Sequence, residues 1–272
     1  MKKINCIEFR DNKLDILEDA VNSFTKVPTL LVIQVGDNFA SNKYVANKVK
    51  RCEEIGIKCD VLKLDENISE VDLIHTLQMK QDNYSAVIVQ EPLPKHINSK
   101  VVNSHLKPEK DCDGLTQDNI GCLHNQKNRI TPATPQGIMN MFGYYGIDLT
   151  GKEVLIVGRS NLVGRPLAEL MLQEDATVTV AHSKTKNLQE KISSGNYDII
   201  VACIGQAKFL KNAKAEYLVD VGINFLDGKM CGDFDIESAQ CNYYTSVPNG
   251  VGVLTQATIV ENVIKCHILQ YS

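Results

Sequence analysis

Several features that define other classes of protein are missing from this sequence, beginning with long apolar segments. No stretch approaches the roughly 20 apolar residues that a membrane-spanning helix needs. The basic N-terminus, Met1–Cys6, is not followed by an apolar run, and charged residues return at Glu8, so we expect no signal peptide. Hydrophobic residues make up 43% of the 272 residues, enough to bury a substantial core. The sequence therefore predicts a soluble globular protein with one large domain or two smaller ones.

A strong excess of charge of either sign is also missing. Charged residues form 23% of the chain, and the formal net charge is −4. This mildly acidic balance argues against general electrostatic binding to nucleic acid, although a local basic patch could still bind phosphate. We therefore expect neither a nucleic-acid nor a membrane partner.

The nine cysteines form no familiar metal motif. None lies in a C-x-x-C pair with matching histidine spacing, and the separation of Cys52 from Cys59 fits no known metal site. In a chain of this length, scattered cysteines are typical of small core residues in a reducing cytosol. The sequence thus favours a cytoplasmic protein without a metal site.

The first half of the chain alternates short apolar runs with helical periodicity. Apolar runs predict strands at Thr29–Val35, Lys58–Leu64 and Ser85–Gln90. Between them, spacing predicts helices at Ser41–Ile55 and Val71–Met79. This βαβαβ order is typical of a parallel sheet with right-handed crossovers.

The second half repeats the alternation after an irregular segment. Lys107–Gly137 is rich in Pro, Asp, Asn, Gly and Thr, so we expect long functional loops that lead to a helix near Gln136–Tyr145. The order that follows predicts a second α/β domain. Strands are predicted at Lys152–Val157, Thr177–Ala181, Asp198–Ile204 and Tyr217–Val221, and helices at Pro166–Gln173 and Thr255–Tyr271.

A glycine-bounded turn follows the first strand of the second half. Gly158 permits a tight turn, and Gly164 permits close packing of the next helix, whose N-terminus offers free N–H groups to a diphosphate. The turn departs from G-x-G-x-x-G because Ser160 replaces the middle glycine. Taken alone, the pattern fits an ordinary strand-to-helix turn about equally well.

The residues after the next strand bear on the choice of cofactor. In a doubly wound sheet this position lies beside the adenosine ribose, where an acidic residue favours NAD. The sequence instead places Ser183 and Lys184 there, with Arg159 nearby, which favours the added phosphate of NADP over NAD. A solvated basic loop is the alternative.

Four polar residues in the first half stand out as candidates for chemistry. Tyr44 and Lys48 share a helix face, and Gln90 closes an apolar strand, where parallel strands gather ligands. Asp113 lies in a polar loop that periodicity does not explain. The alternatives are an ordinary surface pair on the helix, and turn-capping carboxylates at Asp111 and Asp113.

Eight segments, in order across nearly the whole chain, together resemble the bifunctional methylenetetrahydrofolate dehydrogenase/methenyltetrahydrofolate cyclohydrolase family. Each segment alone is weak evidence, but the ordered set is highly specific. They are SNKYVANK (41–48), EEIGI (53–57), VQ-x-PLP (89–94), PEKD-x-DGL (108–115), P-x-TP-x-G (132–137), VGRS-x-x-VG-x-P (157–166), HSKT (182–185) and VP-x-GVG (247–252).

The resemblance implies a role for each of the four polar residues. Lys48 matches the catalytic lysine, Gln90 the glutamine that hydrogen-bonds it, and Tyr44 the aromatic that stacks on the folate. Asp113 matches the carboxylate that holds the pterin edge, whose adjacent N–H donors a carboxylate accepts well. The implied reactions are oxidation of methylenetetrahydrofolate with NADP, and hydrolysis of the methenyl product to formyltetrahydrofolate.

The resemblance also implies domains, an assembly and further binding residues. Residues 1–137 would form an α/β catalytic, folate-binding domain on which a C-terminal helix, 255–272, packs back. Residues 138–254 would form a Rossmann-like, doubly wound NAD(P)-binding domain, with a cleft between the two and a homodimer formed through the Rossmann domains. Cofactor contacts are implied for Gly158, Arg159, Ser160, Gly164, Ser183, Lys184, Gly205 and Ile223, and substrate contacts for Tyr44, Asp113, Pro248 and Gly250.

The sequence departs from the family pattern at several positions. Ala133 replaces a cysteine, Val253 replaces a proline, and Asn249 replaces a glycine. Asn249 is the mildest change, because asparagine tolerates a left-handed backbone better than other non-glycine residues. These departures bear on affinity and cofactor preference more than on reaction type.

Glu91, which replaces a leucine, is the departure nearest the expected chemistry. If Gln90 points toward Lys48, strand alternation points Glu91 away, and the extended backbone favoured before Pro92 agrees. The competing interpretation is that the carboxylate turns inward and stabilises a charged Lys48. We favour the first, because alternation is the default in strands.

Two other functions remain as alternatives. One is a dehydrogenase of the same family without the hydrolytic step, against which Lys48 and Gln90 argue. The other is a non-catalytic dinucleotide-binding regulator, against which the complete polar set in the first half argues.

Overall fold

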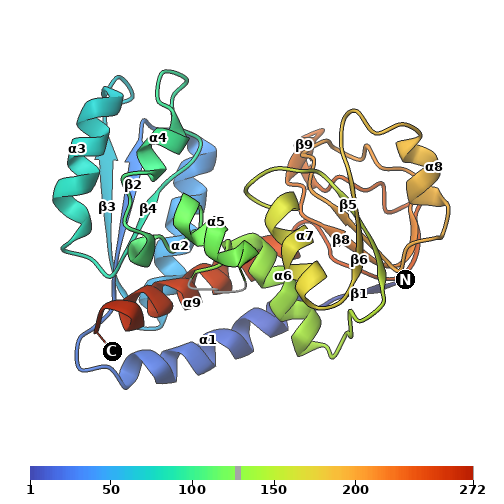
Figure 1. The fold of residues 1–272 in the computed structure, drawn as a ribbon, viewed down its shortest axis with the longest axis horizontal. Coiled ribbons are helices and arrows are strands. Elements are labelled where there is room, and N and C mark those ends of the chain that lie inside the picture. Colours follow the sequence, from blue (N-terminus) through green and yellow to red (C-terminus); the bar gives the residue numbers. More distant parts are fainter. Residues whose placement is uncertain (126–129, 272) are drawn as a thin grey trace. The chain divides into compact units, whose positions relative to one another are not determined.

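The computed structural model describes residues 1–125 and 130–271, which form two compact units. The six-strand unit comprises Met1–Asp11 and Thr134–Thr255. The three-strand unit comprises Asn12–Ala133 and Gln256–Ser272. Each unit has its own sheet (Figure 1). Each also has its own hydrophobic core.

The three-strand unit is built on a parallel sheet of order β3-β2-β4. Its strands are β2 (Thr29–Val35), β3 (Lys58–Leu64) and β4 (Ala86–Val89). Two helices, α2 (Phe39–Glu54) and α3 (Glu70–Gln81), connect them in the order βαβαβ. The predicted parallel α/β arrangement of the first half is confirmed.

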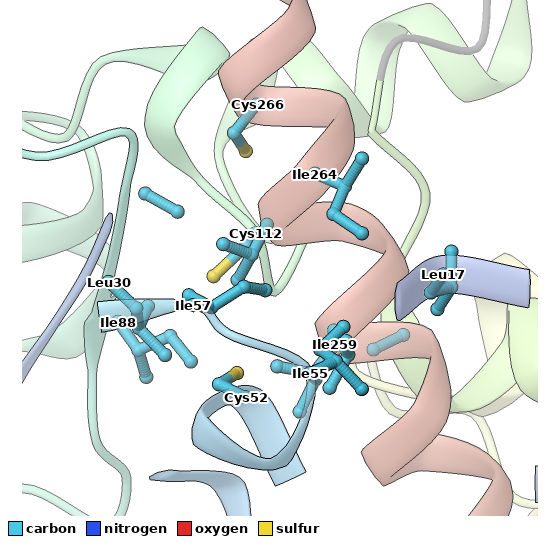
Figure 2. Close-up of a cluster of buried hydrophobic side chains, with 14 of the residues drawn as sticks. Leu17, Leu30, Cys52, Ile55, Ile57, Ile88, Cys112, Ile259, Ile264 and Cys266 are labelled. Atoms are coloured by element: carbon cyan, nitrogen blue, oxygen red, sulfur yellow. The ribbon is translucent and has the colours of Figure 1, made fainter. Parts of the chain in front are cut away.

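Helices cover both faces of this sheet because alternate residues of its strands point to opposite sides. Leu30 and Ile88 pack with Cys52 of α2 and with Ile259 of the last helix (Figure 2). On the other face, neighbouring strand residues pack against Leu73 and Leu77 of α3. A strand buried on both faces reads as a continuous apolar run, which is why β2 was visible in the sequence.

The six-strand unit carries the order β1-β11-β8-β7-β5-β6, with every pair parallel. The chain places β6 on one side of β5 and then returns to place β7 on the other. The order therefore reverses between β5 and β7, as in doubly wound folds that bind ligands at this point. The strands are β1 (Lys2–Lys3), β5 (Glu153–Val157), β6 (Thr177–Ala181), β7 (Ile199–Ala202), β8 (Lys214–Asp220) and β11 (Gln240–Tyr244).

The irregular segment 107–137 contains more regular structure than predicted. Thr116 caps α5 (Gln117–His124) by accepting from Asn119 N at 3.4 Å, so the expectation of loops alone is wrong there. Helix α6 (Ala133–Tyr144) begins three residues earlier than predicted. Residues 126–129 of the predicted loop lie outside the described residues.

Several short or polar elements went unpredicted because their periodicity is weak. The N-terminal helix α1 (Cys6–Asn22) is the longest of them, with a polar outer face. The others are α4 (Ser99–Asn103), the 3₁₀ turn η1 (Pro108–Lys110), α8 (Leu188–Ser193), and the hairpin strands β9 (Asn224–Leu226) and β10 (Lys229–Cys231), together with β1 and β11.

The N-terminal residues belong to the unit that is formed mainly by the second half of the chain. Lys2 and Lys3 pair with Tyr243 and Tyr244, and so Met1–Asp11 belong to the six-strand unit rather than to the catalytic domain predicted for 1–137. The last helix, α9 (Val251–Tyr271), begins four residues before its predicted start. No helix in the described part of the chain is both long and apolar enough to cross a membrane.

Helix α7 (Gly164–Gln173) is the last part of a strand-turn-helix segment in the six-strand unit. It follows β5 directly through the turn 158–163, and it buries Leu167 and Met171 against that strand. A strand, a tight turn and the N-terminus of a helix thus lie at the point where the strand order reverses.

Candidate active site

Lys48 lies at the centre of a polar cluster in the three-strand unit. Its Nζ donates a hydrogen bond to Gln90 Oε1 at 3.2 Å and lies 3.6 Å from Asp113 Oδ2. The lysine side chain is 12% exposed and that of Asp113 is 24% exposed, so the pair is only partly screened by solvent. Three of the four predicted residues, drawn from three separate segments, therefore meet around one amine.

Tyr44 belongs to the same helix as Lys48, one turn earlier. The residue is 41% exposed, which leaves the ring available to a ligand. Partial burial raises the pKa of its hydroxyl, so the side chain stays neutral at physiological pH. A neutral exposed aromatic ring beside a lysine suits stacking on a flat heterocycle.

The orientation of Gln90 follows from the end of β4. Its backbone N donates to Ile33 O at 2.8 Å, which extends the pairing with β2 by one residue. Its side-chain Nε2 donates to Glu91 O, and the amide oxygen is thereby turned toward Lys48. Glu91 itself is exposed whereas Gln90 is buried, as strand alternation predicts, and a cis bond joins Glu91 to Pro92.

The two aspartates of the loop after η1 have different surroundings. Asp111 is 2% exposed and accepts from Gly114 N at 2.9 Å, Thr116 N at 2.7 Å and Asn119 Nδ2 at 3.0 Å. Burial raises the pKa of Asp111 despite these hydrogen bonds. Asp111 is therefore the turn-capping carboxylate, and Asp113 is the one that reaches Lys48.

Asn262 of α9 is a supporting residue that the sequence reasoning missed. It is fully buried, and its Nδ2 donates to Cys112 O and to Thr131 O, each at 2.9 Å. It thus joins the residue before Asp113 to the segment that precedes α6. An asparagine within a largely apolar helix was the available signal, because buried amides need partners.

The turn after β5 has the geometry of a phosphate cradle. Gly158 has φ +132°, and a Cβ there would lie 2.6 Å from Cys203 O. A Cβ on Gly164 would collide with the carbonyl of Gly158, so the start of α7 approaches the strand as closely as the backbone allows. Ser160, in place of the usual middle glycine, accepts from Val163 N at 3.1 Å and so caps the turn.

The predicted ribose-side residues form a second, tight turn after β6. His182 N donates to Thr185 Oγ1 at 2.9 Å, and Lys184 N donates to His182 Nδ1 at 3.1 Å. The histidine is thus structural, and the side chains of Ser183 and Lys184 are exposed. Gly158 N donates to Ala181 O at 2.9 Å, so the two turns leave adjacent strands at the same edge.

The remaining predicted residues are also in the six-strand unit. Gly205 follows β7 with φ +64°, and Ile223 follows β8 and is 39% exposed. Pro248 follows a cis bond, and Gly250 packs against the backbone of Ser246. Asn249 has φ +69°, which confirms that this asparagine adopts a left-handed backbone.

Two α/β units, one with a lysine-centred polar cluster and one with a doubly wound sheet and phosphate cradle, define a dinucleotide-dependent enzyme class. Residues 8–113 match the catalytic domain of the tetrahydrofolate dehydrogenase/cyclohydrolase family, and residues 132–271 match its NAD(P)-binding domain. The chain belongs to this family.

Relatives and solved structures agree with this membership over almost the full chain. The "Bifunctional protein FolD" of Campylobacter concisus is 42% identical, covering 90% of this chain and 89% of the relative. The bifunctional enzyme FolD of Campylobacter jejuni superimposes with a TM-score of 0.94 at 36% identity, covering 99% of both chains. The Trypanosoma brucei dehydrogenase–cyclohydrolase, solved with NADP cofactor and inhibitor, gives 0.91 at 28% identity over 99% of this chain and 98% of that one.

Proposed function

We propose that this protein oxidises methylenetetrahydrofolate with NADP and then hydrolyses the methenyl product to formyltetrahydrofolate. The observation that carries the proposal is the contact of Lys48 Nζ with Gln90 Oε1 and its approach to Asp113. A lone Tyr-x-x-x-Lys pair is common on helices, but an amine held in place by an oriented amide is not explained by packing. Family membership supplies the substrate class.

Lys48 would act as the base of the hydrolytic step. A cationic methenyl substrate beside the amine disfavours its charged form, so the neutral amine can take a proton from water. The water oxygen then bonds to the methenyl carbon, and Lys48 returns the proton to a ring nitrogen as its carbon–nitrogen bond breaks. The new hydroxyl group loses its remaining proton to solvent, which leaves the formyl carbonyl. Gln90 holds the amine without a charge that would keep it protonated.

Asp113 and Tyr44 would bind the folate. Asp113 is an ion-pair partner of Lys48 at 3.6 Å, longer than a hydrogen bond, so pterin N–H donors can replace this contact. Replacement would also release Lys48 from a charge that favours its protonated form. Tyr44 would stack on the ring system, and Pro248 and Gly250 would add substrate contacts.

The six-strand unit would hold the dinucleotide. The turn 158–164 fits a diphosphate, because a side chain at Gly158 or Gly164 would fill the cradle, and the N-terminus of α7 faces it. When bound, the nicotinamide accepts the hydride of the oxidative step. Exposed Arg159, Ser183 and Lys184 would bind the extra phosphate of NADP, and Ser160, Gly205 and Ile223 would line the rest.

We further propose that the enzyme is a cytoplasmic homodimer joined through the six-strand units. Supporting this are apolar side chains exposed on that unit: Val180 of the edge strand β6, and Phe225 and Leu226 of the hairpin, are 38%, 68% and 45% exposed. An unpaired edge strand and exposed apolar side chains both favour association. Light scattering of Phe225→Asp should show monomers if the hairpin contributes.

The test of the proposed function is Lys48→Met. Hydrolysis of methenyltetrahydrofolate should fall by at least about 100-fold, because a positioned base is removed, and the dehydrogenase should be strongly impaired. Lys50→Met is the matched control, because Lys50 lies on the same helix and is exposed. Wild-type hydrolysis by Lys48→Met would disprove the assignment, and accumulation of methenyl product by the native enzyme would favour a dehydrogenase alone.

A further inference from the structure

The loop after β7 lies at the point where the strand order reverses, beside the phosphate cradle. Cys203 N donates to Val157 O at 2.9 Å, the last rung between β7 and β5. The next three backbone N–H groups all turn toward one side chain. Ile204 N and Gly205 N donate to Asp233 Oδ2 at 2.7 and 3.1 Å, and Gln206 N donates to Asp233 Oδ1 at 2.7 Å.

Asp233 also reaches the segment after β8. Asn224 Nδ2 donates to Asp233 Oδ1 at 2.9 Å, which makes four donors on one carboxylate. Asn224 follows Ile223, one of the predicted cofactor contacts, as Gly205 is another. Asp233 is fully buried and lies 27 to 29 residues from the loop that it organises.

A second buried carboxylate holds Asp233 in place. Asp220 Oδ1 accepts from Asp233 N at 2.9 Å, and Asp220 Oδ2 accepts from Phe234 N at 3.0 Å. A Cβ on Gly222 would collide with the Asp233 carboxylate, and one on Gly232 would collide with that of Asp220. The two glycines therefore leave room for the carboxylates, which indicates a built arrangement.

The chemistry of this arrangement decides what the loop can bind. Three successive N–H groups that point to one spot would otherwise form an anion site. Asp233 occupies that spot, so the loop cannot compete with the turn 158–164 for phosphate. Gln206 O accepts from Phe209 N at 3.3 Å within the loop, so the carbonyls of Ile204 and Gly205 are the acceptors that this loop can offer to hydroxyl and amide donors.

We propose that Asp233 is a positioning residue for dinucleotide binding. It fixes the 204–206 loop and, through Asn224, the segment at Ile223, so that both present backbone acceptors to the hydroxyl and carboxamide donors of the cofactor. This rests on the proposed function of the six-strand unit. It predicts a defect confined to dinucleotide binding, because hydrolysis of methenyltetrahydrofolate requires no dinucleotide.

The experiment compares the full-length protein with Asp233→Asn. The amide would place a donor against backbone donors, so the Kd for NADP, measured by calorimetry, should rise by about tenfold or more. Hydrolysis of methenyltetrahydrofolate without dinucleotide should stay within about twofold of the native rate. Amide exchange at residues 204–206 should become faster. Asp198→Asn is the matched control, because Asp198 accepts from Glu153 N at 2.9 Å at the opposite end of the same strands.

A second variant keeps the proposal testable if Asp233→Asn does not fold. Asn224→Ala removes one of the four donors, and it should raise the Kd for NADP by about threefold and speed exchange at 204–206. An unchanged Kd in both variants, or an equal loss of both activities, would overturn the positioning role. If the native protein bound no NADP, the proposed function itself would fail, a result distinct from either.

Discussion

Two buried aspartates shape the candidate sites, one in each unit, and they differ in how far along the chain they act. Asp111 accepts from donors three, five and eight residues later. Asp233 accepts from three backbone donors 27 to 29 residues earlier. Asp111 therefore stabilises a local turn. Asp233 instead connects two loops that lie far apart in the sequence.

This difference has a consequence for stability and for mutation. A local turn can form early and cheaply, because little loop entropy is lost on closing it. The Asp233 arrangement forms only when β7, β8 and the hairpin are already in place. Damage near Asp111 should therefore affect the amine and the folate, whereas damage to the Asp233 arrangement or to the turn 158–164 should affect the dinucleotide.

The largest effects are expected from substitution of one glycine in each unit, which tests whether the two units carry separate functions. In Gly114→Ala the Cβ would lie 2.6 Å from Pro132 N, at a φ of +71°, and in Gly164→Ala it would collide with Gly158 O. Each should lower the free energy of unfolding of its unit by about 2–3 kcal/mol. Gly114→Ala should lose hydrolysis but keep NADP affinity, and Gly164→Ala should show the reverse.

Two helical glycines supply the controls for this pair. A Cβ on Gly121 or on Gly143 would meet nothing within 4 Å, so alanine at either position should be neutral or stabilise by about 0.5–1 kcal/mol. Calorimetric unfolding, the rate of methenyltetrahydrofolate hydrolysis and the Kd for NADP are measured for all four variants. Equal losses of hydrolysis and of NADP affinity in both Gly114→Ala and Gly164→Ala would show that the units do not separate the two functions.

The next test separates the roles of Asp111 and Asp113 in the loop after η1. Asp113→Asn should weaken folate binding by about 2–3 kcal/mol, because the amide offers a donor where the pterin also donates. Its thermal stability should change little, since Asp113 is part-exposed. Asp111→Asn should instead lower the free energy of unfolding by about 1–3 kcal/mol, because buried backbone donors lose an acceptor. An unchanged KM for folate in Asp113→Asn would rule out its proposed role.

Much of the fold was predictable because its strands keep a recognisable pattern, both where they are buried, as in β2, and where they are part-exposed at a sheet edge, as in β6. Thr29–Val35 and Thr177–Ala181 were placed at their observed bounds, since a short apolar run between turn residues is typical of a strand in a parallel sheet. Helix α1 was missed because charged residues interrupt its apolar positions. The hairpin β9–β10 was missed because its strands are three residues long and largely exposed.

The candidate site was predictable where its contacts are local or follow a strand end. Tyr44 and Lys48 are one helical turn apart, and Gln90 ends a strand, so the positions of all three residues could be predicted from spacing. The different fates of Asp111 and Asp113 could not, because they depend on which carboxylate the loop buries. Asp233 and Asn262 act on residues far away in the sequence. An asparagine within an apolar helix signals that Asn262 needs a partner, but no single-sequence pattern names the partners of either residue.

A smaller effect is expected from Arg159 in the turn 158–164. Arg159→Ala should raise the KM for NADP by about tenfold, roughly 1.4 kcal/mol, and affect NAD much less, because an exposed charge contributes modestly. Lys152→Ala is the control, since Lys152 lies at the other end of β5 and pairs with Glu216 at 3.4 Å. Equal losses with both cofactors would show that Arg159 serves the diphosphate or the fold.

The smallest effect concerns the titration of the carboxylate that supports Asp233. Burial raises the pKa of Asp220 to about 7, and the neighbouring Asp233 charge adds to the effect, whereas backbone N–H groups of Gly222, Asp233 and Phe234 oppose it. A carboxyl whose pKa is higher in the folded state binds its proton more tightly there. Its contribution is complete below the unfolded pKa of about 3.8 and is lost as the pH rises through about 7.

The free energy of unfolding should therefore fall by about 1 kcal/mol between pH 6 and pH 8 through Asp220 alone. His267 acts in the opposite direction, because burial lowers its pKa and its contribution is lost as the pH falls below the unfolded value. Only a difference isolates Asp220, so denaturant unfolding of native protein and Asp220→Asn should be compared at each pH. Asparagine changes the free energy of unfolding by the same amount at every pH, because it cannot titrate. The difference in the free energy of unfolding between native protein and Asp220→Asn should therefore become smaller as the pH rises. Parallel curves would mean that Asp220 stays ionised throughout, and that the hydrogen bonds from Gly222, Asp233 and Phe234 outweigh its burial.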